Sequence, residues 1–348
     1  MDATLHQGDI GELFADWAEL FAADDRATPF QSPAWARAWW RHWSDGSRPW
    51  FLEVRDAGRL VGLAPLRSDH LLGMRVLRAY EEPGDYWDVL ARPERRKEVE
   101  EVIGRELQRL RGDWDALILS RLTHDSSTAT SLQRSGLREV HRLAVACPAL
   151  PLPDSFDSYL AALPRDRRSN VRRRLRKLDR GELELRTATV QALPDAIGRW
   201  QALRIRQWNA MGKRMMPEHA QRRFRDFLVE ATTGLVPAGL AVVWEFVRGG
   251  EVVGSFVNFC DARTFYHYLG AFEPELSGLS LGNVATAEGI RSSIAAARSH
   301  YDFGRGREPY KYWYGAVDRL SATVVLSSGR TRSRLAGWLG GFAARWRS

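Results

Sequence analysis

The spacing of apolar residues predicts an α/β protein in which helices and short strands follow one another along the chain. In the first half, apolar residues recur every three or four positions over 10–23, which is typical of a helix that buries one face. Ser32 and Pro33 open a second helix that runs to Trp43. Further strands are expected at 49–56, 59–67, 71–80, 87–90, 113–122 and 137–147, and further helices at 94–110 and 123–134.

The second half also combines helices with short strands. It begins after a segment with several prolines at 148–154, which is typical of a linker. We therefore expect one domain at 1–150, a second at 151–328 and a separate amphipathic helix at 329–348. Helices are predicted at 154–163, 165–180, 191–209, 217–232 and 283–298, and strands at 183–190, 239–247, 251–260, 264–272, 300–304 and 320–328.

Two hairpins, one in each half, resemble each other. Glu53–Gly62 aligns without gaps to Glu245–Gly254, and both contain a glycine turn between apolar flanks. Any tight hairpin has such a turn, so the match alone is not specific. It supports a duplication because each hairpin follows helices and precedes a strand–helix–strand unit. The pattern predicts a tandem duplication of one α/β domain.

Composition narrows the class of protein. The 348 residues are 44% hydrophobic and 27% charged, which excludes a disordered, collagen-like or coiled-coil chain. Cys147 and Cys260 are far apart inside apolar runs, so they predict neither a disulfide framework nor a metal site. With no signal-peptide pattern and no apolar run near the roughly 20 residues of a membrane span, we expect a soluble, cytoplasmic protein.

The positive charge is unevenly distributed. Lys and Arg number 51 against 43 Asp and Glu, and only four of the 51 are lysines. An arginine bias of this kind is typical of a GC-rich coding sequence, so it does not predict a DNA partner.

Nine basic residues gather at 165–180, where two interpretations are open: a clamp for phosphates of CoA, a nucleotide sugar or tRNA, and a simple solvated helix. Five arginines and an apolar stripe at 330–348 predict either a helix lying on anionic lipid at the inner membrane face or one docked on its own domain.

Two runs carry a family resemblance: Tyr266–Gly270, and Tyr301–Lys311 with the sequence YDFGRGREPYK. With weaker support from Ser169–Arg176 and Gly84–Asp88, the chain resembles, over roughly 30–325, the CelD-type proteins of cellulose and exopolysaccharide biosynthesis. That family is similar to the GNAT acetyltransferases and is related to the FemAB aminoacyltransferases. The resemblance implies tandem GNAT-like (acyl-CoA N-acyltransferase) domains, each with a mixed, mainly antiparallel sheet flanked by helices.

An acyl-CoA site follows from this resemblance and from the chemistry of the ligand. A pyrophosphate needs converging backbone N–H groups, which the first turn of a helix offers together with its positive dipole end. In the GNAT fold the strands ending at Gly270 and Gly304 would part to admit the thioester, and N–H groups near Gly270 would hold the developing oxyanion. An ordinary loop-to-helix turn is the alternative. The residues that we expect to bind acyl-CoA (acetyl-CoA) as co-substrate, with no metal, are Leu269, Gly270, Leu279, Ser280, Leu281, Gly282 and Asn283.

Acyl transfer also needs a base for the proton of the acceptor and an acid for the leaving thiolate. Asp302 and Glu308 flank the DFGRG turn and are the base candidates. Tyr310, Tyr312 and Tyr314 are the acid candidates. For either carboxylate, a salt bridge to an arginine is the plain alternative.

Lys311 is one of few lysines in an arginine-rich chain, which favours a role for a compact ammonium group. The resemblance to FemAB proteins implies that it lies near the transferred group or a substrate phosphate. Arg305, in the same run, is expected to bind the acceptor. His267 is expected to be either a packed core histidine or a second base that contacts the acceptor.

In the first half, the resemblance places Asp85, Tyr86 and Asp88 at the acceptor, in a groove between the two domains. Turn capping is the alternative. No glycine-rich loop follows the equivalent strand of this half, so we expect no cofactor in the first domain.

The predicted function is transfer of an acyl group from acyl-CoA to an amine or hydroxyl of a polar acceptor, such as a sugar or a cell-envelope or exopolysaccharide precursor. Two alternatives stay open. One is a FemAB-like aminoacyltransferase that uses aminoacyl-tRNA as donor. The other is a non-catalytic adaptor in an exopolysaccharide-synthesis complex, peripheral at the membrane through its basic C-terminal segment.

Overall fold

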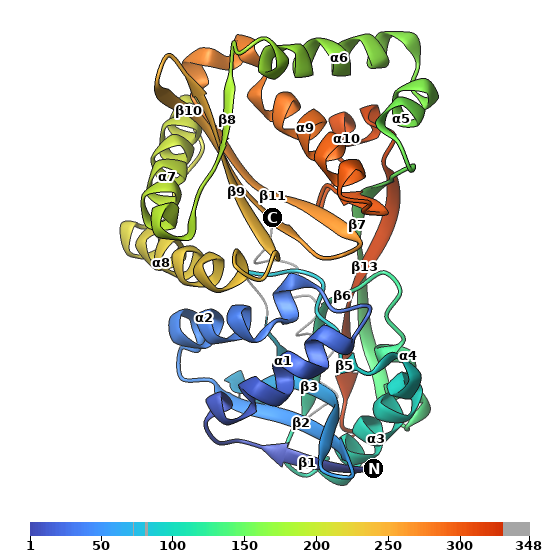
Figure 1. Ribbon diagram of the computed structural model, residues 1–348. Helices are drawn as coiled ribbons and strands as arrows, with labels where there is room; N and C mark the ends of the chain where they lie inside the picture. The colour runs from blue at the N-terminus through green and yellow to red at the C-terminus, as the bar shows by residue number, and fades with distance from the viewer. Residues whose placement is uncertain (72, 81–82, 330–348) are drawn as a thin grey trace. The chain divides into compact units, whose positions relative to one another are not determined.

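The computed structural model describes residues 1–71, 73–80 and 83–329, which form two compact units. Unit 1 contains Met1–Val145 and the described residues from Leu320 onward, and unit 2 contains Ala146–Arg319. Each unit is a sheet flanked by helices (Figure 1), so the fold class is mixed α/β, as the sequence predicts. The helix expected at 329–348 falls, except for Gly329, outside the described residues.

Unit 1 opens with a strand and two helices, continues with a meander of antiparallel strands, and then alternates helix and strand. The second helix starts as the sequence predicts: the Ser32 hydroxyl accepts the N–H of Trp35 at 3.2 Å, and Pro33 takes the first helical position. In chain order the elements are β1 (Asp2–His6), α1 (Phe14–Ala23), α2 (Pro33–Trp43), β2 (Arg48–Asp56), β3 (Arg59–Leu71), β4 (Met74–Ala79), β5 (Leu90–Ala91), α3 (Arg96–Arg109), β6 (Ala116–Leu122), α4 (Thr128–Arg134) and β7 (Arg138–Pro151).

Unit 2 repeats this order of elements after two additional helices. Its elements are α5 (Phe156–Ala162), α6 (Arg165–Asp179), β8 (Glu184–Thr187), α7 (Leu193–Ala210), α8 (Glu218–Leu235), β9 (Ala241–Arg248), β10 (Glu251–Cys260), β11 (Thr264–Phe272), α9 (Leu281–Ala295), β12 (His300–Asp302) and α10 (Pro309–Trp313). The strand that follows, β13 (Val317–Ser327), pairs with β6 of unit 1. Short 3₁₀ helices lie at η1 (Ile10–Leu13), η2 (Pro29–Gln31), η3 (Pro93–Arg95), η4 (Val190–Ala192) and η5 (Pro274–Leu279).

The two sheets have the same strand order. Unit 1 runs β1-β2-β3-β4-β6-β13, and unit 2 runs β8-β9-β10-β11-β12-β7. In each sheet one pair is parallel, β4 with β6 and β11 with β12, and the other neighbours are antiparallel. The last strand of each sheet comes from the opposite half of the sequence. The strand expected at 320–328 as part of the second domain therefore pairs with β6 in unit 1.

The duplication predicted from the two hairpins is confirmed at the level of single residue pairs. Gly62 in β3 and Gly254 in β10 occupy the same register position, each directly beside a β-bulge. A helix lies over each glycine: an added Cβ would lie 2.2 Å from Val99 Cγ1 of α3 in unit 1, and 3.3 Å from Leu281 Cδ1 of α9 in unit 2. The same packing of helix on hairpin therefore recurs in both halves.

The proline-rich segment at 148–154 is not the linker that its composition predicts. Its first part continues β7 to Pro151, and the last three residues of that strand pair with β12. The backbone N–H of Phe303 donates to the carbonyl of Pro148 at 3.0 Å. Because a proline lacks only the N–H donor, its carbonyl still serves a strand ladder.

The core of unit 2 places α9 close against the sheet. Phe246 and Phe256 of the sheet, Ile290 of α9 and Tyr301 of β12 are all buried in one cluster. An added Cβ at Gly289 would lie 2.6 Å from the Tyr301 ring, so the helix approaches β12 closely at a position without a side chain. Figure 1 shows α7 and α8 on the opposite side of this sheet from α9. The start of α9 is thereby fixed beside the ends of β11 and β12.

Two general properties of the described residues bear on function. None of their helices combines the length and the apolar character that crossing a membrane requires. Nor do residues 1–71, 73–80 and 83–329 bring three or more His, Cys, Asp or Glu side chains close enough to hold a metal ion.

Candidate functional site

A cavity of about 560 Å³ opens in unit 2 beside the end of β11. The parallel pairing of β11 with β12 stops at Tyr266 and Asp302, after which β11 continues to Phe272 while β12 ends. The two strands therefore part as the sequence predicts, and the cavity lies next to that opening. Of the predicted site residues, those that line it are His267, Leu269, Gly270, Gly282, Asn283, Arg305, Glu308, Tyr310 and Lys311.

The strand β11 carries a β-bulge at this cavity. Tyr266 and Leu269 each pair with β10, but the two residues between them, His267 and Tyr268, together oppose the single residue Asn258. A bulge interrupts the hydrogen-bonded ladder and re-aims side chains. The backbone of β11 beside the cavity is therefore irregular at the position where an oxyanion donor is predicted.

The start of α9 faces the same cavity through Gly282 and Asn283. Ser280, just before the helix, has a left-handed backbone (φ 54°), and its carbonyl accepts the N–H of Asn283 at 2.9 Å. The N–H groups of Leu281 and Gly282 have no acceptor among the described residues. An added Cβ at Gly282 would meet only the ring of Phe272, at 3.6 Å. An open helix start with no side chain in the way is suited to an anion.

The other predicted acyl-CoA residues build this turn rather than line the cavity. The carbonyl of Leu279 accepts a hydrogen bond from Lys177 Nζ of α6 at 2.7 Å. Leu281 is fully buried, and α9 begins there, two residues earlier than the sequence predicts. Contact of Leu279, Ser280 and Leu281 with acyl-CoA stays a prediction.

Lys311 is almost fully buried, at 2% exposed, and holds the loop after β12 in place. Its Nζ donates to three successive carbonyls, those of Gly304 (3.1 Å), Arg305 (2.6 Å) and Gly306 (3.0 Å), and lies 2.8 Å from Glu308 Oε2. These four acceptors share the three ammonium protons, whereas a planar guanidinium could not donate to three carbonyls around one point. Lys311 therefore positions the loop, and its contact with a transferred group stays a prediction.

Glu308 and Tyr310 line the cavity in opposite protonation states. Burial raises the pKa of Glu308, but the hydrogen bond and charge of Lys311 outweigh it, so this pKa lies below its usual value. Burial, together with the Glu308 charge, raises the pKa of Tyr310 to about 12. At neutral pH the carboxylate is therefore a proton acceptor and the phenol a proton donor.

Three other candidates stand outside the cavity lining. Asp302 Oδ1 accepts the backbone N–H two residues further on, at 2.7 Å, and stabilises the turn after β12. The Tyr312 hydroxyl donates to Asp318 at 2.6 Å, and the Tyr314 hydroxyl donates to Asn283 Oδ1 at 3.0 Å. These side chains support the site, and a catalytic role for Asp302 stays a prediction.

His267 is held by a hydrogen bond between its Nδ1 and the Tyr301 hydroxyl, at 3.0 Å. Beside it, the Thr286 hydroxyl donates to the Gly282 carbonyl at 2.9 Å. Burial and then the Lys311 charge lower the pKa of His267 to about 4, so the ring is neutral at neutral pH.

Arg204 of α7 also lines the cavity, although the sequence analysis does not single it out. Its guanidinium carbon lies 4.3 Å from the Trp208 ring centroid and 5.4 Å from that of Trp200. The three residues are four apart, so they share one face of the helix. That Trp-x₃-Arg-x₃-Trp spacing is the signal in the sequence that indicates this residue.

Asp85, Tyr86 and Asp88 lie in unit 1, whereas unit 2 alone forms the cavity. Asp85 Oδ1 lies 3.3 Å from Arg121 Nη1, and both side chains are buried. Asp88 is 2% exposed and its carboxylate accepts the N–H of Val89, so it has the turn-capping role and is a structural residue of unit 1. Acceptor contact stays a prediction for Asp85 and Tyr86. The other donors to the Asp88 carboxylate are the hydroxyls of Thr123, Ser126 and Thr128.

Residues 165–312 match a family model described as an acetyltransferase (GNAT) domain. The range contains every residue that lines the cavity. The cavity therefore lies within a segment that is similar to acetyltransferase (GNAT) domains.

Solved structures share the fold over both units. The chain is similar to FemX, with a TM-score of 0.67, 11% identity, and 93% of this chain and 97% of that one covered. It is also similar to the C-terminal domain of an Agrobacterium fabrum protein assigned as a lysylphosphatidylglycerol synthetase (TM-score 0.58, 10% identity, 94% and 95% covered). A third is L-PGS from Bacillus licheniformis (TM-score 0.50, 10% identity, 85% and 89% covered). No curated protein sequence matches the chain significantly.

Proposed function

We propose that the protein transfers an acyl group from acyl-CoA to an amine or hydroxyl of a polar acceptor, such as a sugar or a cell-envelope or exopolysaccharide precursor. The observation that carries this proposal is the convergence on one cavity of an open helix start, a bulged strand and a phenol proton donor, within an acetyltransferase-type domain. The choice of acceptor rests on the resemblance of the YDFGRGREPYK run to CelD-type proteins.

The residues present fit an acyl-CoA donor. The open N–H groups of Leu281 and Gly282, at the positive end of α9, would hold the pyrophosphate. Backbone N–H groups of the bulged strand near Leu269 and Gly270 would hold the oxygen of the thioester carbonyl as it gains negative charge. Lys177 supports the same turn from α6 through the carbonyl of Leu279.

The cavity also supplies the proton transfers that acyl transfer requires. The neutral His267 ring has one unprotonated nitrogen and the Glu308 carboxylate is ionised at neutral pH, and either takes the proton of the attacking amine or hydroxyl. Tyr310 gives its proton to the departing sulfur. The bond from the acceptor to the acyl carbon forms as the carbon–sulfur bond breaks, so one proton is taken and one is given.

The test is release of the CoA thiol from acetyl-CoA in the presence of a panel of amines and amino sugars. Replacing the acid, Tyr310→Phe, is expected to lower turnover by about 100-fold or more. The matched control is Tyr312→Phe, because this phenol lies outside the cavity lining and donates to Asp318. Failure of the unaltered protein to release thiol with every acceptor, or equal rates for the two variants, would contradict the proposal.

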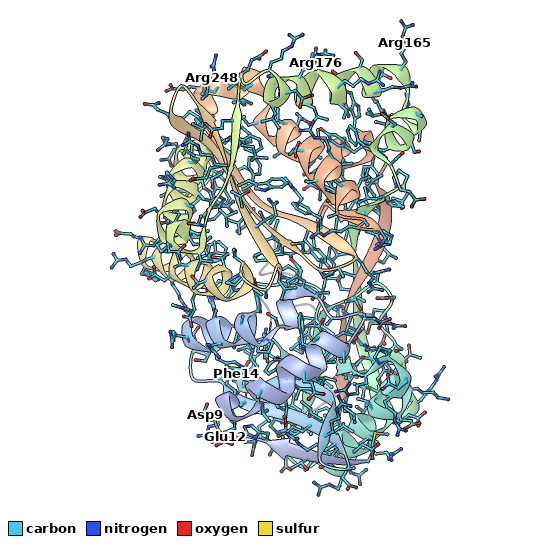
Figure 2. The ribbon with its side chains drawn as sticks, in the orientation of Figure 1. Asp9, Glu12, Phe14, Arg165, Arg176 and Arg248 are labelled. Carbon is cyan, nitrogen blue, oxygen red and sulfur yellow. The ribbon has the colours of Figure 1, made fainter. Side chains whose placement is uncertain are left out.

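A second candidate, aminoacyl transfer from aminoacyl-tRNA, is favoured by the uncompensated charge of α6. Within residues 83–329 none of the nine basic side chains of this segment has a carboxylate within salt-bridge distance. Figure 2 shows Arg165 and Arg176 pointing away from the body of unit 2. A row of cations without carboxylate partners suits the phosphates of a nucleic acid strand. The nine are Arg165, Arg167, Arg168, Arg172, Arg173, Arg174, Arg176, Lys177 and Arg180.

This candidate is tested by transfer of a labelled amino acid from charged tRNA, with and without ribonuclease. A triple variant, Arg172→Gln with Arg173→Gln and Arg176→Gln, should lose tRNA binding and flatten its dependence on salt. A matched triple variant replaces Arg186, Arg222 and Arg225, each of which is paired with a neighbouring carboxylate, and should bind normally. Transfer that is insensitive to ribonuclease would exclude tRNA as the donor.

A further inference from the structure

Arg204 lines the cavity, and no carboxylate of the described residues 83–329 neutralises its charge. The helix α7 carries three arginines, and two of them form ion pairs: Arg199 with Glu245 at 2.6 Å and Arg206 with Glu273 at 3.0 Å. Arg204 has no carboxylate partner within residues 83–329, although it is partly buried on two indole rings. A guanidinium held in this way needs a counter-charge from a ligand.

The two tryptophans orient the guanidinium. The Trp208 ring covers one face of the planar Arg204 guanidinium, and Trp200 packs at the neighbouring turn of the helix. A stacked guanidinium keeps its N–H donors in its own plane, where they match the two oxygens of a carboxylate or phosphate. Burial lowers the pKa of Arg204, which agrees with its poor contact with water.

The rest of the lining adds to the positive charge. Arg305 and Lys311 line the cavity with Arg204, and Glu308 is the one carboxylate among the lining residues. That carboxylate is already 2.8 Å from Lys311 Nζ. A neutral ligand would therefore leave the charge of Arg204 uncompensated.

We propose that Arg204 binds a carboxylate or phosphate group carried by a substrate, so that the enzyme selects anionic over neutral substrates. This specificity rests on the proposed acyl transfer. The anionic group belongs either to the acceptor or to the acyl chain. In both cases Arg204 acts on binding rather than on proton transfer, so its loss raises KM for the anionic substrate and removes the preference for it.

The acceptor arm of the test compares ethanolamine with O-phosphoethanolamine, and glucosamine with glucosamine 6-phosphate, using acetyl-CoA. The donor arm compares acetyl-CoA with succinyl-CoA. In one of the two comparisons, kcat/KM should be about tenfold or more higher for the anionic compound than for its neutral counterpart. Arg204→Gln should abolish that preference through KM, while the control Arg206→Gln keeps it. Equal kcat/KM within every pair, or a preference that survives Arg204→Gln, would overturn the proposal.

Calorimetric titration separates this proposal from the proposed function. O-phosphoethanolamine and succinate are titrated into the unaltered protein and into both variants, and acetyl-CoA is titrated separately. Anion binding that is lost in Arg204→Gln supports the anion site even where acetyl-CoA does not bind. Binding of acetyl-CoA without binding of either small anion would overturn the anion site and leave acyl transfer standing.

Discussion

The two units present the same helix start in two different states. In unit 1 the first residue of α3, Arg96, turns its side chain inward and forms a buried ion pair with Asp24, while its Nη1 donates to the carbonyl of Val89 at 3.0 Å. In unit 2 the first residues of α9 are Leu281, Gly282 and Asn283, and the N–H groups of the first two have no acceptor among the described residues.

The difference shows how a duplicated scaffold supports one functional site. Both helices pack over the glycine of an equivalent hairpin, so the framework is common to the two units. In unit 1 a large cationic side chain occupies the helix start and is neutralised within the protein. In unit 2 small residues leave the helix start open to a cavity. The site therefore depends on a few residues at one turn.

The largest effect should come from breaking the loop after β12 in unit 2. Lys311→Met removes the donor to three part-buried carbonyls and destabilises the loop by about 1–3 kcal/mol. Because Glu308 and Tyr310 sit on that loop, turnover should fall by about 100-fold. Steady-state kinetics and urea unfolding measure the two effects. The control is Lys97→Met, at the exposed start of α3; equal losses in the two variants would remove Lys311 from its positioning role.

The equivalent glycines should respond unequally to one added methyl group. Gly62→Ala would place Cβ 2.2 Å from Val99 Cγ1, and the overpacking should destabilise unit 1 by about 1–3 kcal/mol. Gly254→Ala meets Leu281 Cδ1 at 3.3 Å and should destabilise unit 2 by less than about 1 kcal/mol. Urea midpoints of the two variants give the comparison, and a larger shift for Gly254→Ala would contradict the packing described here.

The smallest effect is a pH dependence of opposite sign in the two units. Burial raises the pKa of Asp88 in unit 1 to about 6, so its contribution to stability is present at low pH and is lost as the pH rises through 6. Burial and the Lys311 charge lower the pKa of His267 to about 4, so its contribution is present above about pH 6.5 and is lost as the pH falls toward 4. Acidification from pH 7 to pH 5 should therefore favour unit 1 and disfavour unit 2 through these groups.

The measurement is the change in the free energy of unfolding between pH 7 and pH 5. Relative to the unaltered protein, Asp88→Asn should make acidification more destabilising, and His267→Gln should make it less so. Shifts of the same sign in both variants would contradict the assigned protonation states.

Much of this fold can be predicted from the sequence because its signals are local. The glycine turns at Gly58 and Gly250 and the apolar alternation around them predict the two hairpins, and their gapless alignment predicts the shared register. The exchange of β7 and β13 between the sheets could not be predicted, because it depends on pairing between distant segments. The prolines at 148–151 pointed to a linker, since a sequence pattern does not show that a proline carbonyl still accepts a ladder hydrogen bond.

The site shows the same limit. The turn after β12 and the start of α9 could be predicted, since the YDFGRGREPYK run and the apolar periodicity of the helix are each local signals in the sequence. Residue spacing does not show which carbonyls accept the hydrogen bonds of Lys311. Nor does it show that three hydroxyls donate to the buried Asp88 carboxylate. Arg204 lies almost a hundred residues before the loop, so only the tryptophans at four-residue spacing mark it.

The central claim is that the open start of α9 is the donor site, and direct binding of acetyl-CoA tests it. Calorimetry should detect binding to the unaltered protein and an affinity about tenfold or more lower for Asn283→Glu, because a carboxylate at this helix start repels the pyrophosphate. Tyr314→Phe removes the hydrogen bond to Asn283 without adding charge and should bind nearly normally. Absence of binding by the unaltered protein, or unchanged affinity in Asn283→Glu, would contradict the account.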